Sequence, residues 1–290
     1  MNISDSPLFK DYARPVLKSG AHRARASSYS PSGIKDTAMQ HLLNLAKLEA
    51  SRFKISDATE DSFCLAIESR LASVRAISST IDAMNTELFF NGFSFGKIKL
   101  PEIHTSFWGT DVAVEEQRID ITNRATYHTF IRSLIVDQDT ALQLKSSSCK
   151  VRALGTLSTC DLCLDIPLKS LGGPRITLKK LSRAGEDVAA TFSFSNPSPV
   201  EIDHGRCIFE LRNTNGETLA ELKGELNIVH GQTDLVLNGT RRNGAGASDR
   251  ARLVGIGAEA SGNERSRCRD TVREVDAVFE LKPEYARLLW

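Results

Sequence analysis

The sequence predicts a mainly β protein made of two tandem antiparallel β-sandwiches, with an N-terminal helix and one inserted helix. Apolar residues recur at every second position through most of the 290 residues, which is the spacing of a strand with one buried face. Gly, Pro and Asn-Gly turn signals separate these runs. A short echo, Gly109–Val114 against Gln232–Leu237, indicates that one unit occurs twice.

The segment Thr191–Leu211 is the clearest example of this unit. Phe192 and Phe194 alternate with small polar residues, and the run Asn196-Pro-Ser-Pro199 follows them. The two prolines exclude a helix, and they exclude a ladder that continues through the turn. We therefore expect a strand, a tight turn and a second strand, arranged as a hairpin.

The composition limits the function classes. The formal net charge is +1, so no global field draws the chain to nucleic acid or to an anionic membrane. The start of the chain has no continuous apolar segment, and nowhere do ~18 apolar residues run together, so we expect neither a signal peptide nor a transmembrane helix. The sequence predicts a soluble protein, cytoplasmic rather than secreted, and leaves its compartment open.

Three regions are expected along the chain. Residues 1–33 are Ser-rich and basic and predict a disordered tail, which could contact a membrane surface through anionic lipid, or an acidic partner. Residues 34–172 comprise the N-terminal helix and the first sandwich. The run Gly172-Gly173-Pro174 marks the boundary, and residues 173–290 form the second sandwich.

In the first sandwich region, Asp36 or Thr37 can cap a helix that runs through Ala50. Asn91-Gly92 predicts a hairpin turn, and the spacing of the apolar residues in Ala125–Asp137 predicts the inserted helix. The remaining apolar runs alternate and predict strands. They cover residues 53–55, 63–67, 81–90, 93–100, 111–121, 141–154 and 157–168.

In the second region, strands are predicted on both sides of a turn at Asn213–Gly216. A Gly-rich polar loop is expected at Arg241–Arg250. The strands cover residues 176–181, the hairpin described above, 219–229, 232–237, 252–256 and 271–281.

Six cysteines are too widely spaced for a disulfide scaffold, and we expect mostly buried thiols. Only Cys160-Asp-Leu-Cys163 has the spacing of a metal or redox pair. A zinc site needs a second pair, and a redox motif needs a preceding βα unit. Neither is found, so we predict packing or an incidental pair, and no metal.

No catalytic or cofactor motif stands out. Gly255-Ile-Gly257 resembles part of a dinucleotide fingerprint, but the βαβ context is missing, so no cofactor is expected. His104 at a strand end and His204 beside Asp203 could each join an acid–base pair. We interpret both as surface or turn residues. The catalytic residues, if any, are not identifiable.

The most unusual apolar residues are Trp108, Tyr127, His128 and Phe130. The last three lie on the inserted helix. If this helix covers the open end of a sandwich, the four could line a cavity for an apolar ligand. Alternatively, the helix simply closes the core.

Motifs along the chain resemble a known family. Asn196-Pro-Ser-Pro is similar to the Asn-Pro turn of late-embryogenesis-abundant type 2 (LEA2, WHy-like) β-sandwiches. Four further motifs occur in the order typical of an uncharacterised fungal family built on that fold. They are Ala46-Lys-Leu48, Asp61-Ser-Phe63, Ile81–Asn85 and Gly96–His104. The resemblance covers Met39 to Thr240.

The resemblance implies a location near membranes. Members of the family usually carry a transmembrane helix before the Ala-Lys-Leu motif and hold their sandwiches in a lumen or outside the cell. One branch is linked to control of autophagy at the vacuolar membrane. Here, polar and basic residues stand before the motif instead, which indicates either a soluble relative or a shortened gene model.

Two functions remain after the sequence is read. The first is a non-enzymatic binding or scaffold protein that contacts lipid, a membrane surface or a protein partner. The second is a soluble fungal enzyme of specialised metabolism, an isomerase or cyclase with an apolar substrate cavity. Because no nucleophile, base or metal set converges, we favour the first, and we expect no contact with nucleic acid.

Overall fold

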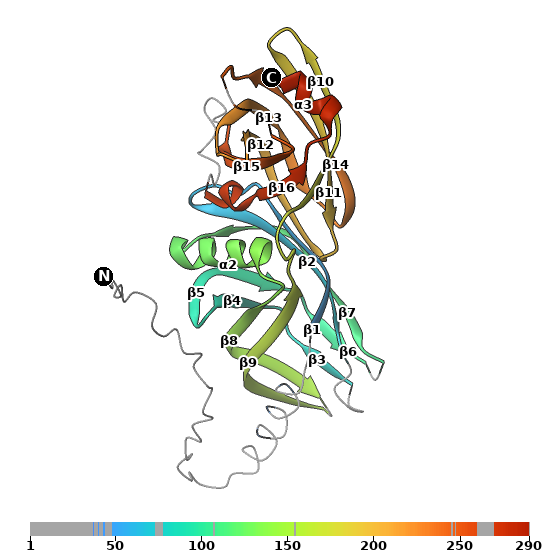
Figure 1. The fold of residues 1–290 in the computed structure, drawn as a ribbon. Coiled ribbons are helices and arrows are strands. Elements are labelled where there is room, and N and C mark those ends of the chain that lie inside the picture. The colour runs from blue at the N-terminus through green and yellow to red at the C-terminus, as the bar shows by residue number, and fades with distance from the viewer. Residues whose placement is uncertain are drawn as a thin grey trace, which may run out of the picture.

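The computed structural model describes residues 37, 40, 43, 48–72, 78–106, 108–153, 155–244, 246, 248–259 and 270–289. The prediction of a mainly β protein is confirmed, with the strands in two sheets (Figure 1). The larger sheet has ten strands, in the order β10 (Arg175–Ala184), β11 (Asp187–Asn196), β14 (Gly231–Arg241), β13 (Thr218–Ile228), β12 (Val200–Asn213), β1 (Leu48–Ser56), β2 (Ser62–Leu71) and β7 (Thr110–Asp120), with β15 (Arg250–Ala258) on β12 and β16 (Asp276–Glu280) on β15.

The second sheet has six strands and lies in the N-terminal half. Its order is β5 (Phe93–Leu100), β4 (Met84–Phe90), β8 (Asp139–Ala153), β3 (Ser79–Ile81) and β6 (Ile103–Thr105), with β9 (Thr156–Lys169) paired to β8. The described helices are α2 (Arg124–Val136), the 3-10 helix η1 (Asp270–Glu274) and α3 (Pro283–Leu289).

One parallel pairing joins the two halves. Phe53 of β1 lies opposite Val200 of β12, and Ile55 lies opposite Ile202, whereas every other ladder among the described strands is antiparallel. β12 pairs with β1 near its start and with β15 from Cys207 onward. The larger sheet is therefore continuous through both halves, and it forks where β1 and β15 diverge.

The inserted helix forms as predicted, one residue earlier at each end. The side chain of Asn123 caps it by accepting a hydrogen bond from the backbone N–H of Thr126 at 3.1 Å. The helix lies between the six-stranded sheet and η1 (Figure 1). Across that second contact, Arg132 of α2 and Glu274 of η1 form an ion pair at 3.3 Å. The helix therefore packs on both halves.

The Asn196 turn is built from buried hydrogen bonds. The Asn196 side chain accepts from the Ser198 backbone N–H at 2.9 Å and donates to the Val200 carbonyl at 2.7 Å. The Ser198 hydroxyl donates to the Lys169 carbonyl at the end of β9, and His230 Nδ1 lies 2.9 Å from the Ser198 carbonyl oxygen. The turn thus ties three strands together.

The predicted hairpin around this turn is wrong. β11 pairs with β10 and β14, while β12 pairs with β13, β1 and β15, so the two strands beside the turn are not hydrogen-bonded to each other. Two consecutive alternating strands are equally compatible with a hairpin and with a crossing between positions in a sheet. The local pattern could not distinguish them.

We expect Asn196→Ala to lower the free energy of unfolding by about 2 kcal/mol, because it leaves a buried N–H and a buried carbonyl without partners. Urea denaturation measures this loss. Asn215→Ala is the control, since Asn215 is exposed at the tip of the β12–β13 turn. An equal loss in both variants would contradict the role assigned to the buried amide.

Both ends of the folded region differ from the prediction. Thr37, Gln40 and Leu43 are helical, but the predicted helix end at Ala50 is wrong because β1 already begins at Leu48. The Gln40 amide bonds to both backbone groups of Asp161, at 2.7 and 2.8 Å, and so fixes the helix to β9. At the other end, η1 and β16 replace the single strand predicted at 271–281, and α3 was not predicted.

The predicted tail, residues 1–33, lies outside the described residues. Among the residues that are described, no helix combines the length and the apolar character needed to cross a membrane. Gly172 and Gly173, the predicted boundary, connect β9 to β10.

Candidate functional site

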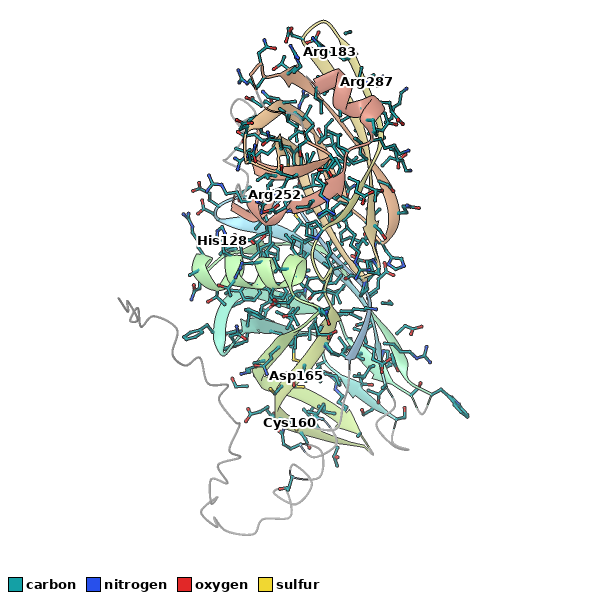
Figure 2. The ribbon with its side chains drawn as sticks, in the orientation of Figure 1. His128, Cys160, Asp165, Arg183, Arg252 and Arg287 are labelled. Atoms are coloured by element: carbon teal, nitrogen blue, oxygen red, sulfur yellow. The ribbon has the colours of Figure 1, made fainter. Side chains whose placement is uncertain are left out.

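The four residues predicted to line an apolar site do not lie together. Tyr127 and Phe130 are buried on α2, whereas His128, on the same helix, is only half-buried (Figure 2). Trp108 is 81% exposed in the turn between β6 and β7. The cavity beside Tyr127 therefore does not include Trp108.

The space around Tyr127 and Phe130 is mostly filled by aromatic rings. The Tyr127 ring stacks on Phe63 with centroids 4.7 Å apart. The Phe130 ring lies 5.4 Å from both Phe90 and Phe95. Such contacts are typical of a close-packed core. The inserted helix thus closes the core, as the alternative interpretation expects.

A cavity of about 150 Å³ remains at the fork of the large sheet. Residues of α2, of the β1–β2 turn, of β12, of β13 and of η1 line it. They are Ile55, Asp57, Ala58, Tyr127, Ile131, Ile202, Asp203, His204, Gly205, Glu225 and Thr271. This cavity lies between the two halves of the molecule, and the described residues that line it include three acidic residues and one histidine.

His204 occupies an irregular position in β12. The register against β13 shifts between Asp203 and Gly205, and Gly205 has a φ of 63°. The Asp203 carboxylate accepts a hydrogen bond from the Gly205 backbone N–H at 2.8 Å. A glycine with positive φ is typical of a β-bulge, which redirects a side chain. The bulge therefore fixes His204 at the cavity.

The imidazole of His204 is buried. Its residue is 8% exposed, and neither ring nitrogen forms a hydrogen bond of good geometry with a described residue, although the Ile202 backbone lies close to the ring. Burial lowers the pKa of His204 to about 4, although the Asp203 carboxylate and the Ile202 backbone raise it. The ring is therefore neutral at pH 7, with one donor and one acceptor nitrogen.

The prediction that His204 is a surface or turn residue is wrong, because it lies buried within β12. An isolated glycine inside a strand pattern predicts a bulge, and Gly205 was the signal that could have located the site. His104 is exposed as predicted. Its Nε2 lies 3.0 Å from the Glu102 carboxylate.

The turn that carries Trp108 is tightly hydrogen-bonded. Arg70 donates to the Trp108 carbonyl at 2.9 Å and pairs with Asp111 at 3.1 Å. The Thr110 hydroxyl donates to the His104 carbonyl at 2.8 Å. Because the backbone is fixed on both sides, the exposed indole is held on an ordered support.

Two sequence motifs are explained by packing. Cys160 is buried and Cys163 is exposed, because residues three apart in a strand lie on opposite faces. Cys149 lies opposite Cys160 on β8, and burial raises the pKa of Cys149 to about 11. Gly255 lies within β15 rather than in a loop before a helix. Within the described part of the chain, no cluster of His, Cys, Asp or Glu could hold a metal ion.

Residues 94–211 match the family model described as a protein of unknown function, DUF3712. The match covers less than half of the chain, and over that part the predicted resemblance to an uncharacterised family is confirmed. No curated protein matches the chain.

Three solved structures show weak similarity to the chain. Red sea bream transglutaminase is 15% identical, with 79% of this chain and 31% of that chain covered and a TM-score of 0.22. A β-glucuronidase from glycoside hydrolase family 2 is 9% identical, with 70% and 24% covered and a TM-score of 0.20. CBD12 from CALX1.2 is 8% identical, with 73% and 80% covered and a TM-score of 0.18. The chain spans less than a third of the first two proteins, and these scores carry no argument about function.

Proposed function

We propose that this chain is a non-enzymatic scaffold that contacts a membrane surface with the end of the molecule that carries Trp108. In this proposal, the two halves are tandem variants of the LEA2-like sandwich, and the chain is a soluble relative of the membrane-anchored fungal family. The single observation that carries the proposal is the exposed indole on a hydrogen-bonded turn. Tryptophan is enriched at membrane interfaces because its ring is apolar and its N–H is polar.

The strand register supports a common end for the relevant segments. Leu48 at the start of β1 lies opposite Leu71, and Leu71 lies opposite Thr110, two residues after Trp108. The chain therefore enters the fold at the end where Trp108 projects. Residues 1–33, which precede this entry, contain five Lys or Arg and two Asp. A basic segment that precedes an interfacial aromatic residue in a chain is suited to an anionic membrane.

The folded end itself is electrically balanced. Arg70 pairs with Asp111, Arg152 pairs with Asp82, and His104 lies beside Glu102. In the same region, Leu157 near the start of β9 is exposed. We therefore assign the apolar contact to Trp108 and Leu157, and the electrostatic attraction to residues 1–33.

The size of the cavity supports binding over catalysis. A pocket for a drug-sized substrate has roughly 300–1,000 Å³. The cavity beside Tyr127 has about 150 Å³, and the aromatic core below it is filled. The cavity beside Tyr127 is therefore too small for an isomerase or cyclase substrate. Two larger hollows, of about 520 Å³ beside Asn238 and about 680 Å³ beside Glu87, lie open at the surface.

Vesicle sedimentation tests the proposal. We expect the full chain to bind vesicles of phosphatidylcholine that contain about 30 mol% phosphatidylserine, because a basic segment is attracted to anionic lipid. Trp108→Ala should weaken binding about tenfold, because burying one large apolar side chain contributes about 1.5–3 kcal/mol and tenfold in affinity corresponds to 1.4 kcal/mol.

Phe93→Ala is the matched control. Phe93 is 64% exposed at the β4–β5 hairpin, where β5 begins. Because β5 ends at Leu100 just before β6, Phe93 lies at the end of β5 that is far from the Trp108 turn. Its loss should leave binding unchanged. Equal weakening by both substitutions, or no binding by the full chain, would contradict the proposal.

A further inference from the structure

We propose that Cys149 and Cys160 form a disulfide across the β8–β9 hairpin when the chain folds in the presence of a small-molecule disulfide such as oxidised glutathione. The two cysteines are direct partners in the antiparallel ladder between these strands. Their exposed fractions are 0% and 5%, so both side chains belong to the core. The bond is independent of the proposed membrane contact.

The strand register sets the separation that a disulfide needs. Residues directly opposite each other in an antiparallel pair have Cα atoms about 4.5 or 5.5 Å apart. Disulfides span Cα separations of roughly 4.4–6.8 Å. Side chains directly opposite each other also project from the same face of a sheet, and here both project into the core. The two strands are therefore already placed for the bond.

The thiol of Cys160 acts electrostatically on Cys149. Burial is the main cause that raises the pKa of Cys149 to about 11, and the charge of Cys160 adds to it. Because such an effect falls with distance, it agrees with two neighbouring sulfur atoms. A buried thiol with a raised pKa reacts slowly, since the thiolate is the reacting form. We therefore expect the bond to form while the chain folds and to be protected afterwards.

This pairing is specific among the described cysteines. Cys64, Cys163 and Cys207 lie opposite other residue types in their ladders, namely Ser56, Arg118, Lys145, Gly224 and Ala258. Cys163 is in addition exposed on the other face of β9. Within the described part of the chain, only Cys149 and Cys160 therefore have a cysteine as direct cross-strand partner.

The reaction consists of two successive thiol–disulfide exchanges. In the first, the thiolate of one cysteine attacks a sulfur atom of oxidised glutathione, and one glutathione leaves. In the second, the thiolate of the other cysteine attacks the mixed disulfide and releases the second glutathione. The two protons of the cysteine thiols end on the two released glutathione molecules. The chain is thereby oxidised, and the small disulfide is reduced.

The bond would hold the hairpin at an irregular position. The register between β8 and β9 shifts between Ser146 and Cys149, so the ladder is interrupted directly beside the pair. A disulfide that fits the native geometry restrains the unfolded chain and so stabilises the fold. We therefore expect the oxidised chain to unfold at a higher urea concentration than the reduced chain.

Cell-free synthesis of the full chain in a glutathione redox buffer tests the bond. Free thiols are blocked with iodoacetamide, and the chain is then digested with trypsin, which cleaves after Lys and Arg. Cys149 falls in the peptide 146–150, and Cys160 falls in the peptide 153–169. We expect mass spectrometry to detect these two peptides joined. Synthesis with dithiothreitol in place of oxidised glutathione should give them separately.

Two matched variants identify the partner of Cys149, because the peptide 153–169 also contains Cys163. Cys160→Ala and Cys163→Ala each remove one thiol from this peptide. We expect Cys160→Ala to abolish the joined peptide and Cys163→Ala to retain it.

Three results would overturn the inference. They are an absence of the joined peptide from folded chain made with oxidised glutathione, retention of the joined peptide in Cys160→Ala, and a lower urea midpoint for the oxidised chain than for the reduced chain. None of these results bears on vesicle binding, so the membrane proposal would stand or fail separately.

Discussion

Gly255→Ala is expected to lower the free energy of unfolding by about 4 kcal/mol or more, a large effect for a single methyl group. A Cβ atom at this position would lie 1.9 Å from the Val272 carbonyl oxygen and 3.0 Å from Val272 Cγ1. The backbone N–H of Gly255 also donates to the Val275 carbonyl at 2.8 Å. Because the Val272 carbonyl belongs to η1 and Val275 directly follows it, the 3-10 helix must move away from β15.

Urea denaturation of Gly255→Ala and Gly246→Ala compares a crowded glycine with an uncrowded one. A Cβ at Gly246 would meet its nearest atom, Glu217 Oε2, at 3.5 Å, which is an ordinary contact. We expect Gly246→Ala to change stability by less than about 1 kcal/mol. If Gly255→Ala is equally mild, η1 does not pack against β15 as described.

Acidification should destabilise the fold through His204. Its pKa is lowered by burial from 6.5 to about 4, so between these values the unfolded chain takes up a proton that the folded chain does not. Stability attributable to His204 is complete above pH 6.5 and falls as the pH decreases toward 4. The loss over that range is about 3 kcal/mol, from 1.36 kcal/mol per pKa unit.

The comparison with His204→Gln isolates this contribution. The charged group that acts on His204 is the Asp203 carboxylate, and it is present in both proteins. We expect the free energy of unfolding of the unmodified chain to fall about 3 kcal/mol further between pH 6.5 and pH 4 than that of the variant. Parallel pH profiles would show that His204 is not buried in its neutral form.

Local sequence signals predicted the elements that depend on neighbouring residues. Asn91-Gly92 forms the β4–β5 turn, with φ values of 49° and 85° that suit these two residue types. Tyr127, Phe130 and Leu134 are spaced to share one buried face, and α2 follows from that spacing. Asn196 and its prolines gave the position of the turn between β11 and β12.

Pairing between distant segments could not be predicted in this way. Nothing near Phe53 indicates a parallel partner at Val200, and the hydrophobic pattern of β1 fits many partners. Residues 271–281 alternate well enough to suggest one strand, but η1 forms where the chain turns against Gly255.

The candidate site was only partly predictable for the same reason. Tyr127 was chosen because it is aromatic and lies on the inserted helix, and it does line the cavity. Its neighbours there come from segments that meet only through the fork of the sheet. Trp108 is aromatic as well, but the turn between β6 and β7 places it at another end of the molecule. Its exposure there supports the proposed membrane contact rather than a place in the cavity.

Depth-dependent quenching of Trp108 fluorescence tests the membrane proposal most directly. A Trp290→Phe variant leaves Trp108 as the single tryptophan. With vesicles that contain phosphatidylserine and brominated phosphatidylcholine, we predict quenching that is strongest for bromine placed near the headgroups, together with a blue-shifted emission. Unchanged emission and no quenching at saturating lipid would contradict the claim that this end of the scaffold contacts a membrane.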